Sequence, residues 1–175
     1  HHRSSAASDV YKRQIKTIVN LRGVRRDGGW LLENEACSKY NIKLIDFRAR
    51  SRAAPEKEMI LKAEKLFNSI KYPALIHCKS GADRAGIMCA LYMLIYKKQH
   101  PDIAKKQLSW KYLHVKWAKP GVLDAFVESY SIEYKKNKFK FMDWVKNKYN
   151  PEKLESSFRS VWWLNRFLDD ILRRE

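Results

Sequence analysis

A cysteine and an arginine stand six positions apart in the run His77–Gly86, which reads HCKSGADRAG. The run follows an apolar segment at 72–77 and precedes a segment at 85–98 whose apolar residues recur at helical spacing. This order predicts a strand, a tight loop and a helix in direct succession. Gly81 gives the loop the conformational freedom that a ring of inward-pointing backbone N–H groups requires. We therefore expect an α/β fold, a small parallel sheet flanked by helices.

The loop between that strand and that helix is suited to a bound phosphate. A phosphate there would face backbone N–H groups and the N-terminus of the following helix, where the helix dipole favours an anion. The guanidinium of Arg84 can donate to two phosphoryl oxygens at once. The predicted phosphate-binding residues are Lys79, Ser80, Gly81, Ala82, Asp83 and Arg84.

The same surroundings should activate Cys78. A thiolate among N–H donors and beside an arginine is favoured over the thiol, which lowers its pKa from the roughly 8.5 of a reference thiol. Cys78 is therefore the predicted nucleophile, attacking phosphorus to form a phosphocysteine that water hydrolyses. We expect His77 to orient the loop by hydrogen bonding. A buried structural cysteine beside an unrelated glycine turn is the alternative.

The run HCKSGADRAG resembles the HCxxGxxR(S/T)G signature of the cysteine-dependent tyrosine and dual-specificity phosphatases. Weaker similarity to bacterial dual-specificity-like members extends from about Ile15 to the C-terminus. The resemblance implies a phosphomonoester hydrolase with a dual-specificity phosphatase-like fold and a mainly helical C-terminal half. The matching positions are His77, Cys78, Gly81, Arg84 and Gly86.

Directly after the arginine the family carries Ser or Thr, whereas this chain carries Ala85. In the family that hydroxyl bonds to the cysteine sulfur and helps it leave the phosphoenzyme. Its absence predicts slow breakdown of the intermediate and leaves the capture of phosphate by Cys78 intact. A phosphate-binding module with little turnover, a pseudophosphatase, is therefore a second hypothesis.

Two aspartates are candidates for the acid that protonates the leaving oxygen. Asp46 lies 32 positions before Cys78, a separation similar to that of the loop aspartate in dual-specificity phosphatases, but its segment reads as a strand. Asp83 lies in the loop itself, as in the CxxxxDR loops of some phosphoinositide phosphatases. It could also be a loop residue that bonds its own backbone. Either carboxyl would have to be protonated, which predicts a mildly acidic optimum.

Basic residues follow each of the three predicted strands, in a chain of formal net charge +17. Because the carboxyl ends of parallel strands meet at one edge of a sheet, these side chains should converge on one mouth. A substrate with more than one phosphate, such as a phosphoinositide, an inositol phosphate or a triphosphate end, would suit it. The alternative is an ordinary solvated basic surface. Arg25 and Arg26 belong to this set, and the predicted substrate-recognition residues are Arg22, Arg48, Arg50 and Arg52.

The expected partners are a phosphorylated protein, a phosphorylated small molecule or a phospholipid. The run 158–174, rich in tryptophan, aliphatic residues and arginine, could contact an anionic membrane surface. Aromatic residues among the lysines of 135–148 could stack on nucleic acid, but no recognised binding motif accompanies them, so nucleic acid is not expected. A basic scaffold for RNA or membrane is the third hypothesis.

The chain has 175 residues, of which 45% are hydrophobic, enough for one compact domain. We expect a single phosphatase domain at 15–175 with a C-terminal helical extension. Residues 1–14 resemble a translated sequencing adapter, so we expect the domain to be truncated at its N-terminus. The three cysteines predict no disulfide framework and a cytoplasmic setting. No metal or cofactor is expected, and Cys37 and Cys89 are predicted to be structural.

The remaining pattern alternates strand and helix signals. Prolines mark the starts of three of the predicted helices. Strands are predicted at 16–21 and 42–47, and helices at 30–40 and 55–70, from Pro101, and from Pro120.

Overall fold

The computed structural model describes residues 14–160, so most of the adapter-like segment and of the run 158–174 lies outside it. The sheet has three parallel strands, β1 (Thr17–Asn20), β2 (Lys43–Asp46) and β3 (Ala74–His77), in the order β2-β1-β3. At the end of β1, Asn20 lies level with Asp46 and His77, so the three carboxyl ends meet at one edge.

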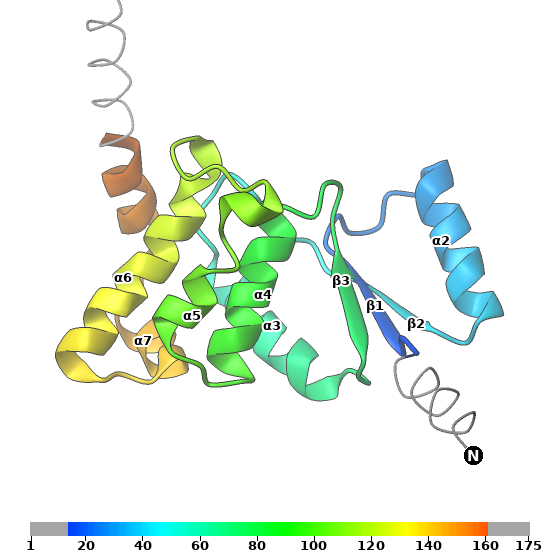
Figure 1. Cartoon of the computed structure of the whole chain (residues 1–175), viewed down its shortest axis with the longest axis horizontal. Coiled ribbons are helices and arrows are strands. Elements are labelled where there is room, and N and C mark those ends of the chain that lie inside the picture. Colours follow the sequence, from blue (N-terminus) through cyan, green and yellow to red (C-terminus); the bar gives the residue numbers. More distant parts are fainter. Residues whose placement is uncertain (1–13, 161–175) are drawn as a thin grey trace, which may run out of the picture.

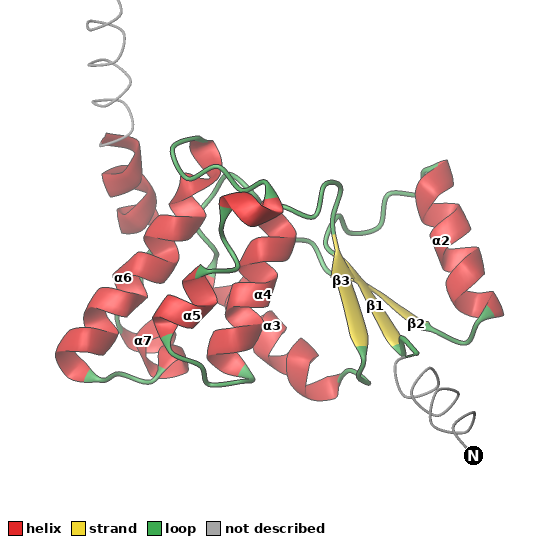
Figure 2. Cartoon of the chain, viewed as in Figure 1, coloured by secondary structure: helices red, strands yellow, loops and turns green. Residues whose placement is uncertain are grey.

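Helices lie on either side of this small sheet (Figures 1 and 2). One helix, Gly28–Lys39, contacts the edge strand β2. Another, Asp83–Ile95, contacts the other edge strand, β3, and the remaining helices pack around this second helix. The helices are α2 (Gly28–Lys39), α3 (Lys57–Ser69), α4 (Asp83–Ile95), α5 (Pro101–Lys105), α6 (Val122–Asn137) and α7 (Phe141–Asn147), with 3-10 turns at Trp110–Tyr112 and Lys119–Gly121.

The predicted α/β class and the helical C-terminal half are confirmed. α2 begins two residues before its predicted start because the carboxylate of Asp27 accepts a hydrogen bond from the backbone N–H of Trp30 at 3.0 Å and caps the helix. Pro101 begins α5 as predicted. Pro120 lies in the 3-10 turn directly before α6. No helix within residues 14–160 is long and apolar enough to cross a membrane.

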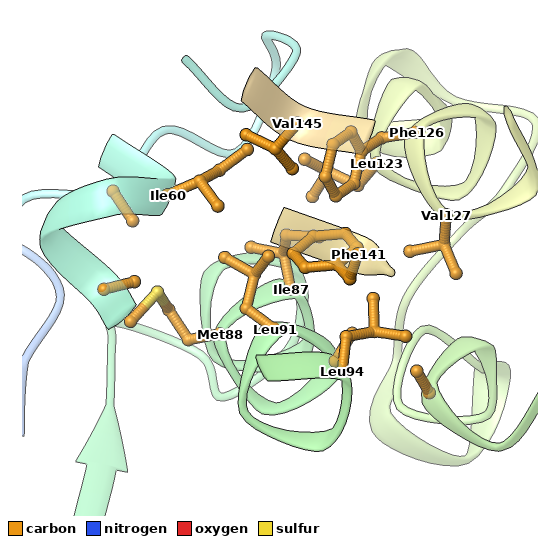
Figure 3. Close-up of a cluster of buried hydrophobic side chains, with 14 of the residues drawn as sticks. Ile60, Ile87, Met88, Leu91, Leu94, Leu123, Phe126, Val127, Phe141 and Val145 are labelled. Carbon is orange, nitrogen blue, oxygen red and sulfur yellow. The ribbon is translucent and has the colours of Figure 1, made fainter. Parts of the chain in front are cut away.

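Most of the hydrophobic core lies in the helical half, where α4 is surrounded by its neighbours (Figure 3). Each of its large buried side chains stabilises the fold by roughly 1.5–3 kcal/mol. Among its residues are Ile60 of α3, Ile87, Met88, Leu91 and Leu94 of α4, Leu123, Phe126 and Val127 of α6, and Phe141 and Val145 of α7.

The aromatic residues of the lysine-rich stretch belong to this core. Phe141, Trp144 and Tyr149 are all buried, and each of the three rings lies 5.0–6.1 Å from that of Phe126. Rings buried in this way are not exposed for stacking on a base. Their spacing therefore reflects packing, as expected for a stripe at helical period.

Candidate active site

The loop between β3 and α4 lies at the carboxyl edge of the sheet (Figure 1). Gly81 has a φ of +73°, a backbone conformation that residues with a side chain rarely adopt, so the predicted need for glycine there is confirmed. Gly86 serves packing instead. A Cβ at Gly86 would come within 2.9 Å of the carbonyl oxygen of Gln107. The second glycine of the signature therefore lets α4 approach the segment after α5.

Cys78 sits half-buried at the start of this loop. Burial alone raises the pKa of its thiol, but hydrogen bonds from the backbone N–H groups of Ala85, Ser80 and Gly81, together with the charge of Arg84, outweigh it and lower the pKa. The contribution of the N–H of Ala85 was not foreseen from the sequence, which draws attention only to the missing hydroxyl.

A cavity of about 840 Å³ opens above the loop. Its lining includes Cys78 and a single carboxylate, Asp83, among the described residues. The structure brings all four predicted recognition arginines to this cavity, whereas Arg26 is not in its lining. The cationic side chains that line it are Arg22, Arg25, Arg48, Arg50, Arg52, Lys79 and Arg84.

Close contacts between loops hold these cations together. Gly23, at a φ of +72°, lies against Arg48, whose Cβ is 3.4 Å from the position that a Cβ of residue 23 would take. Asp27 pairs with both Arg22, at 3.1 Å, and Arg25, at 3.3 Å. One donor stays unused: among the described residues, the Nε of Arg22 is buried and has no hydrogen-bond partner. A buried N–H of this kind favours an acceptor on a ligand.

The two candidate acids lie in different surroundings. Asp46 is not in the cavity lining. It accepts hydrogen bonds from the side chain of Asn20 at 2.8 Å and from the indole N–H of Trp30 at 3.1 Å, and so ties β2 to β1 and α2. Asp83, the first residue of α4, lines the cavity together with Cys78.

His77 lies at the end of β3, beneath the loop. Its Nδ1 is 3.3 Å from the carbonyl oxygen of Cys78. Its Nε2 is 2.8 Å from a carboxylate oxygen of Glu33. These contacts from β3 to the loop and to α2 fit the predicted orienting role, which stays a prediction.

A buried histidine that the sequence did not single out also reaches the site. Nδ1 of His114 lies 2.8 Å from a carboxylate oxygen of Asp83, and Nε2 lies 2.6 Å from one of Asp124. In the sequence, His114 and Asp124 lie ten positions apart on either side of Pro120 and Gly121, which could have suggested that they are in contact. Nothing in the sequence suggests the contact of His114 with Asp83, which is 31 positions away. Within residues 14–160 no group of His, Cys, Asp or Glu is arranged to hold a metal ion.

A family model described as "Swiss Army Knife protein, DSP-PTPase phosphatase domain" (PTP-SAK) matches residues 2–122, more than half of the chain. The chain belongs to this family. As a DSP-PTPase domain it is a cysteine-dependent phosphatase of the tyrosine and dual-specificity type, and the resemblance of the signature is confirmed.

Solved structures resemble this DSP-PTPase domain in fold. The crystal structure of P. aeruginosa TpbA is 16% identical and aligns with a TM-score of 0.52, over 72% of this chain and 74% of TpbA. A cysteine-to-serine variant of TpbA in complex with pTyr is 13% identical and also has a TM-score of 0.52, over 75% of this chain and 80% of the variant. No curated protein sequence shows significant similarity.

Proposed function

We propose that this DSP-PTPase domain hydrolyses a substrate that carries several phosphates close together, through a phosphocysteine on Cys78. The observation that carries the proposal is the cavity lining, in which seven cationic side chains and one carboxylate surround the nucleophile. A single phosphate needs only the loop and Arg84. The arginines that follow β1 and β2 would hold further phosphates.

The proposed chemistry has two steps. The thiolate of Cys78 attacks phosphorus, the bond from phosphorus to the leaving oxygen breaks, and that oxygen takes a proton from Asp83. Water then attacks the phosphocysteine, the sulfur–phosphorus bond breaks, and the proton of the water passes to Asp83. We assign the proton transfer to Asp83 and not to Asp46 because Asp83 lines the cavity. Throughout, Arg84 and the loop N–H groups bind the phosphoryl oxygens.

The multiply phosphorylated group could be free or part of a membrane lipid. The segment 109–118 lies beside the cavity, since His114 in it contacts Asp83. This segment exposes the side chains of Trp110 and Trp117, with relative accessibilities of 68% and 79%, and Lys111 and Lys116 lie between them. Tryptophan and lysine together are typical of a surface that contacts anionic lipid, so we include the lipid form among the substrates to be tested.

The test compares phosphate release from four substrates. These are para-nitrophenyl phosphate, an inositol ring with several phosphates, the same headgroup in lipid vesicles, and a phosphotyrosine peptide. We expect the inositol compounds to have the highest kcat/KM. We expect Arg48→Gln and Arg52→Gln each to lower kcat/KM for them by roughly 10–100-fold, the loss of one charge-assisted contact. The same variants should change hydrolysis of para-nitrophenyl phosphate by less than about 3-fold.

Arg159→Gln is the matched control, because Arg159 is exposed, pairs only with Glu155 among the described residues, and does not line the cavity. A preference for the free headgroup over the vesicle would assign a soluble substrate, and the reverse a lipid. A clear preference for the phosphotyrosine peptide, unaffected by the two arginine variants, would contradict the proposed substrate class. Phosphate capture without release would make the domain a pseudophosphatase.

A further inference from the structure

Three side chains from distant parts of the chain form a hydrogen-bonded series beside the phosphate-binding loop. Asp83 comes from the first turn of α4, His114 from the segment between α5 and α6, and Asp124 from the first turn of α6. The ring of His114 lies between the two carboxylates, at 2.8 Å from Asp83 and 2.6 Å from Asp124. The side chains of His114 and Asp124 are 1% and 3% exposed, and that of Asp83 is 25% exposed.

The protonation of His114 follows from these contacts. A neutral imidazole carries one N–H and can donate only one hydrogen bond. Both ring nitrogens face carboxylate oxygens, so only the imidazolium donates to Asp83 and Asp124 together. Burial alone would lower the pKa of His114, but the hydrogen bonds and charges of the two aspartates outweigh it and raise the pKa. The ionisable groups of the described chain that act on this ring are these two aspartates, from α4 and α6.

The segment that carries His114 has a constrained backbone. Leu113 adopts a left-handed conformation with a φ of +59°. The backbone N–H of His114 donates to the carbonyl of Ser109 at 3.2 Å. Gly121 lies so close to the carbonyl of Lys116 that a Cβ could not be accommodated there. The position of the imidazole is therefore set by its own loop as well as by its two partners.

A negative charge on Asp83 is unfavourable at this position, and the positive charge of His114 compensates it. Asp83 is the single carboxylate among the described residues that line a cavity suited to anions. Whenever this carboxyl is deprotonated, as it is between the two proton transfers of the proposed reaction, its charge opposes a phosphoryl group in the loop. We propose that His114 is a positioning residue that anchors Asp83 to α6 and offsets the charge of its ionised form, so that the loop binds a phosphoryl group more tightly than it would beside an uncompensated carboxylate. This inference rests on the proposed function, because it concerns the same loop.

The proposal predicts an effect on binding that depends on Asp83. His114→Asn keeps a polar side chain but cannot become a cation. We expect it to weaken the binding of vanadate, a phosphate analogue, by roughly 10-fold near neutral pH. In an Asp83→Asn background there is no carboxylate to neutralise, so we expect the same change to alter vanadate affinity by less than about 2-fold. This coupling is what distinguishes neutralisation of Asp83 from a general role in stability.

A second variant tests the charge of His114 directly. Asp124→Asn retains an oxygen that can accept from Nε2, but it removes one of the two charges that raise the pKa of His114. His114 should therefore lose its proton at a lower pH than in the wild type. Because the neutral ring no longer compensates Asp83, vanadate affinity should begin to fall at that lower pH as well. Titration of the ring by NMR and of vanadate affinity by calorimetry should give midpoints that shift together.

His100→Asn is the control. His100 caps α5, at the end of α4 opposite to the loop, so vanadate affinity should keep its wild-type pH dependence. Equal weakening by His114→Asn with and without Asp83 would overturn the inference. So would an Asp124→Asn variant that lowers the melting temperature while its vanadate profile stays unshifted. Vanadate binding needs no turnover, so wild-type protein that binds vanadate without releasing phosphate would refute the proposed function alone.

Discussion

Cys78 and Cys89 lie 11 positions apart, one just before α4 and one inside it, and their surroundings shift their pKa values in opposite directions. Around Cys78, backbone N–H groups and Arg84 outweigh burial and lower the pKa. Around Cys89, burial acts alone and raises it. The helix α4 thus runs from the loop at Cys78, which stabilises a negative charge, into the core at Cys89, where burial disfavours one.

The residues that make the protein reactive and the residues that make it stable lie in different parts of the molecule. The cavity gathers seven cations around one carboxylate, an arrangement that costs folding energy through mutual repulsion. The core of α4, α6 and α7 gathers aliphatic and aromatic side chains that offset this cost. Changes near Cys78 should therefore affect activity with little loss of stability, and changes around Cys89 should do the reverse.

The largest expected effect is the loss of the nucleophile. Cys78→Ser should lower kcat for para-nitrophenyl phosphate by roughly four orders of magnitude or more, because a serine hydroxyl stays protonated where the thiol ionises. Cys89→Ser is the matched control and should retain most of the activity at 25 °C. Both are checked by continuous assay and by circular dichroism. Comparable activity of the wild type and Cys78→Ser would rule out the proposed mechanism.

Substitutions in the core should lower the stability of the protein and leave its activity nearly unchanged. Phe126 is fully buried and contacts the rings of Phe141, Trp144 and Tyr149, so Phe126→Ala should lower the free energy of unfolding by about 3–5 kcal/mol. Urea unfolding at 15 °C measures this. The fraction that stays folded should still hydrolyse para-nitrophenyl phosphate at a kcat close to that of the wild type. A large fall in kcat of the folded fraction would show that the two regions are not separable.

Arg84→Lys keeps the positive charge and removes the planar fork. We expect kcat/KM to fall by roughly 100-fold, because a lysine cannot donate two parallel hydrogen bonds to the phosphoryl group in the transition state. Arg159→Lys, on the exposed helical segment, should change nothing measurable. Steady-state kinetics on both variants decide this. If kcat/KM of Arg84→Lys matched that of the wild type, a positive charge without the planar geometry of the guanidinium would be enough for catalysis.

The cysteines should also differ in reactivity with pH. A lowered pKa means that Cys78 stays a thiolate as the pH falls below the usual thiol range, whereas the raised pKa values of Cys37 and Cys89 keep those thiols protonated. At pH 6.5 we expect iodoacetamide to modify Cys78 about ten-fold faster than either of the others, or more. Mass spectrometry of digested protein gives the three rates. Bound phosphate should protect Cys78 alone.

The sequence predicted the cavity better than it predicted the acid. Gly81, Arg84 and the basic strand ends lie close along the chain to a strand or a glycine, so periodicity and the geometry of a parallel sheet were enough to bring them together. Asp46 and Asp83 could not be ranked in this way. The two aspartates differ in their tertiary contacts. Asp46 accepts hydrogen bonds from Asn20 and Trp30, whereas Asp83 contacts His114.

His114 was missed for the same reason. Its partner Asp83 is 31 positions away, and the contact forms only when the segment between α5 and α6 packs against the first turn of α4. The exposure of Trp110 and Trp117 was equally unpredictable, because a tryptophan in a chain of this composition is more often buried. Local patterns predicted the elements and the loop, whereas contacts between elements determine how the loop is supported.

The smallest expected effect concerns Ala85, at the boundary between the two regions. Backbone N–H groups of Ala85, Ser80 and Gly81 already donate to the sulfur of Cys78, so a hydroxyl on residue 85 would add a further donor instead of supplying the first. We therefore expect Ala85→Ser to speed breakdown of the phosphocysteine by only about 3–10-fold. Stopped-flow measurement should show a burst of para-nitrophenol in the wild type and a smaller burst in the variant. Ala90→Ser, in the same helix but in the core, should lower stability and leave the burst unchanged. A wild type that turns over without a burst would show that breakdown is not the slow step, and that the backbone N–H groups around the sulfur are enough for it to leave.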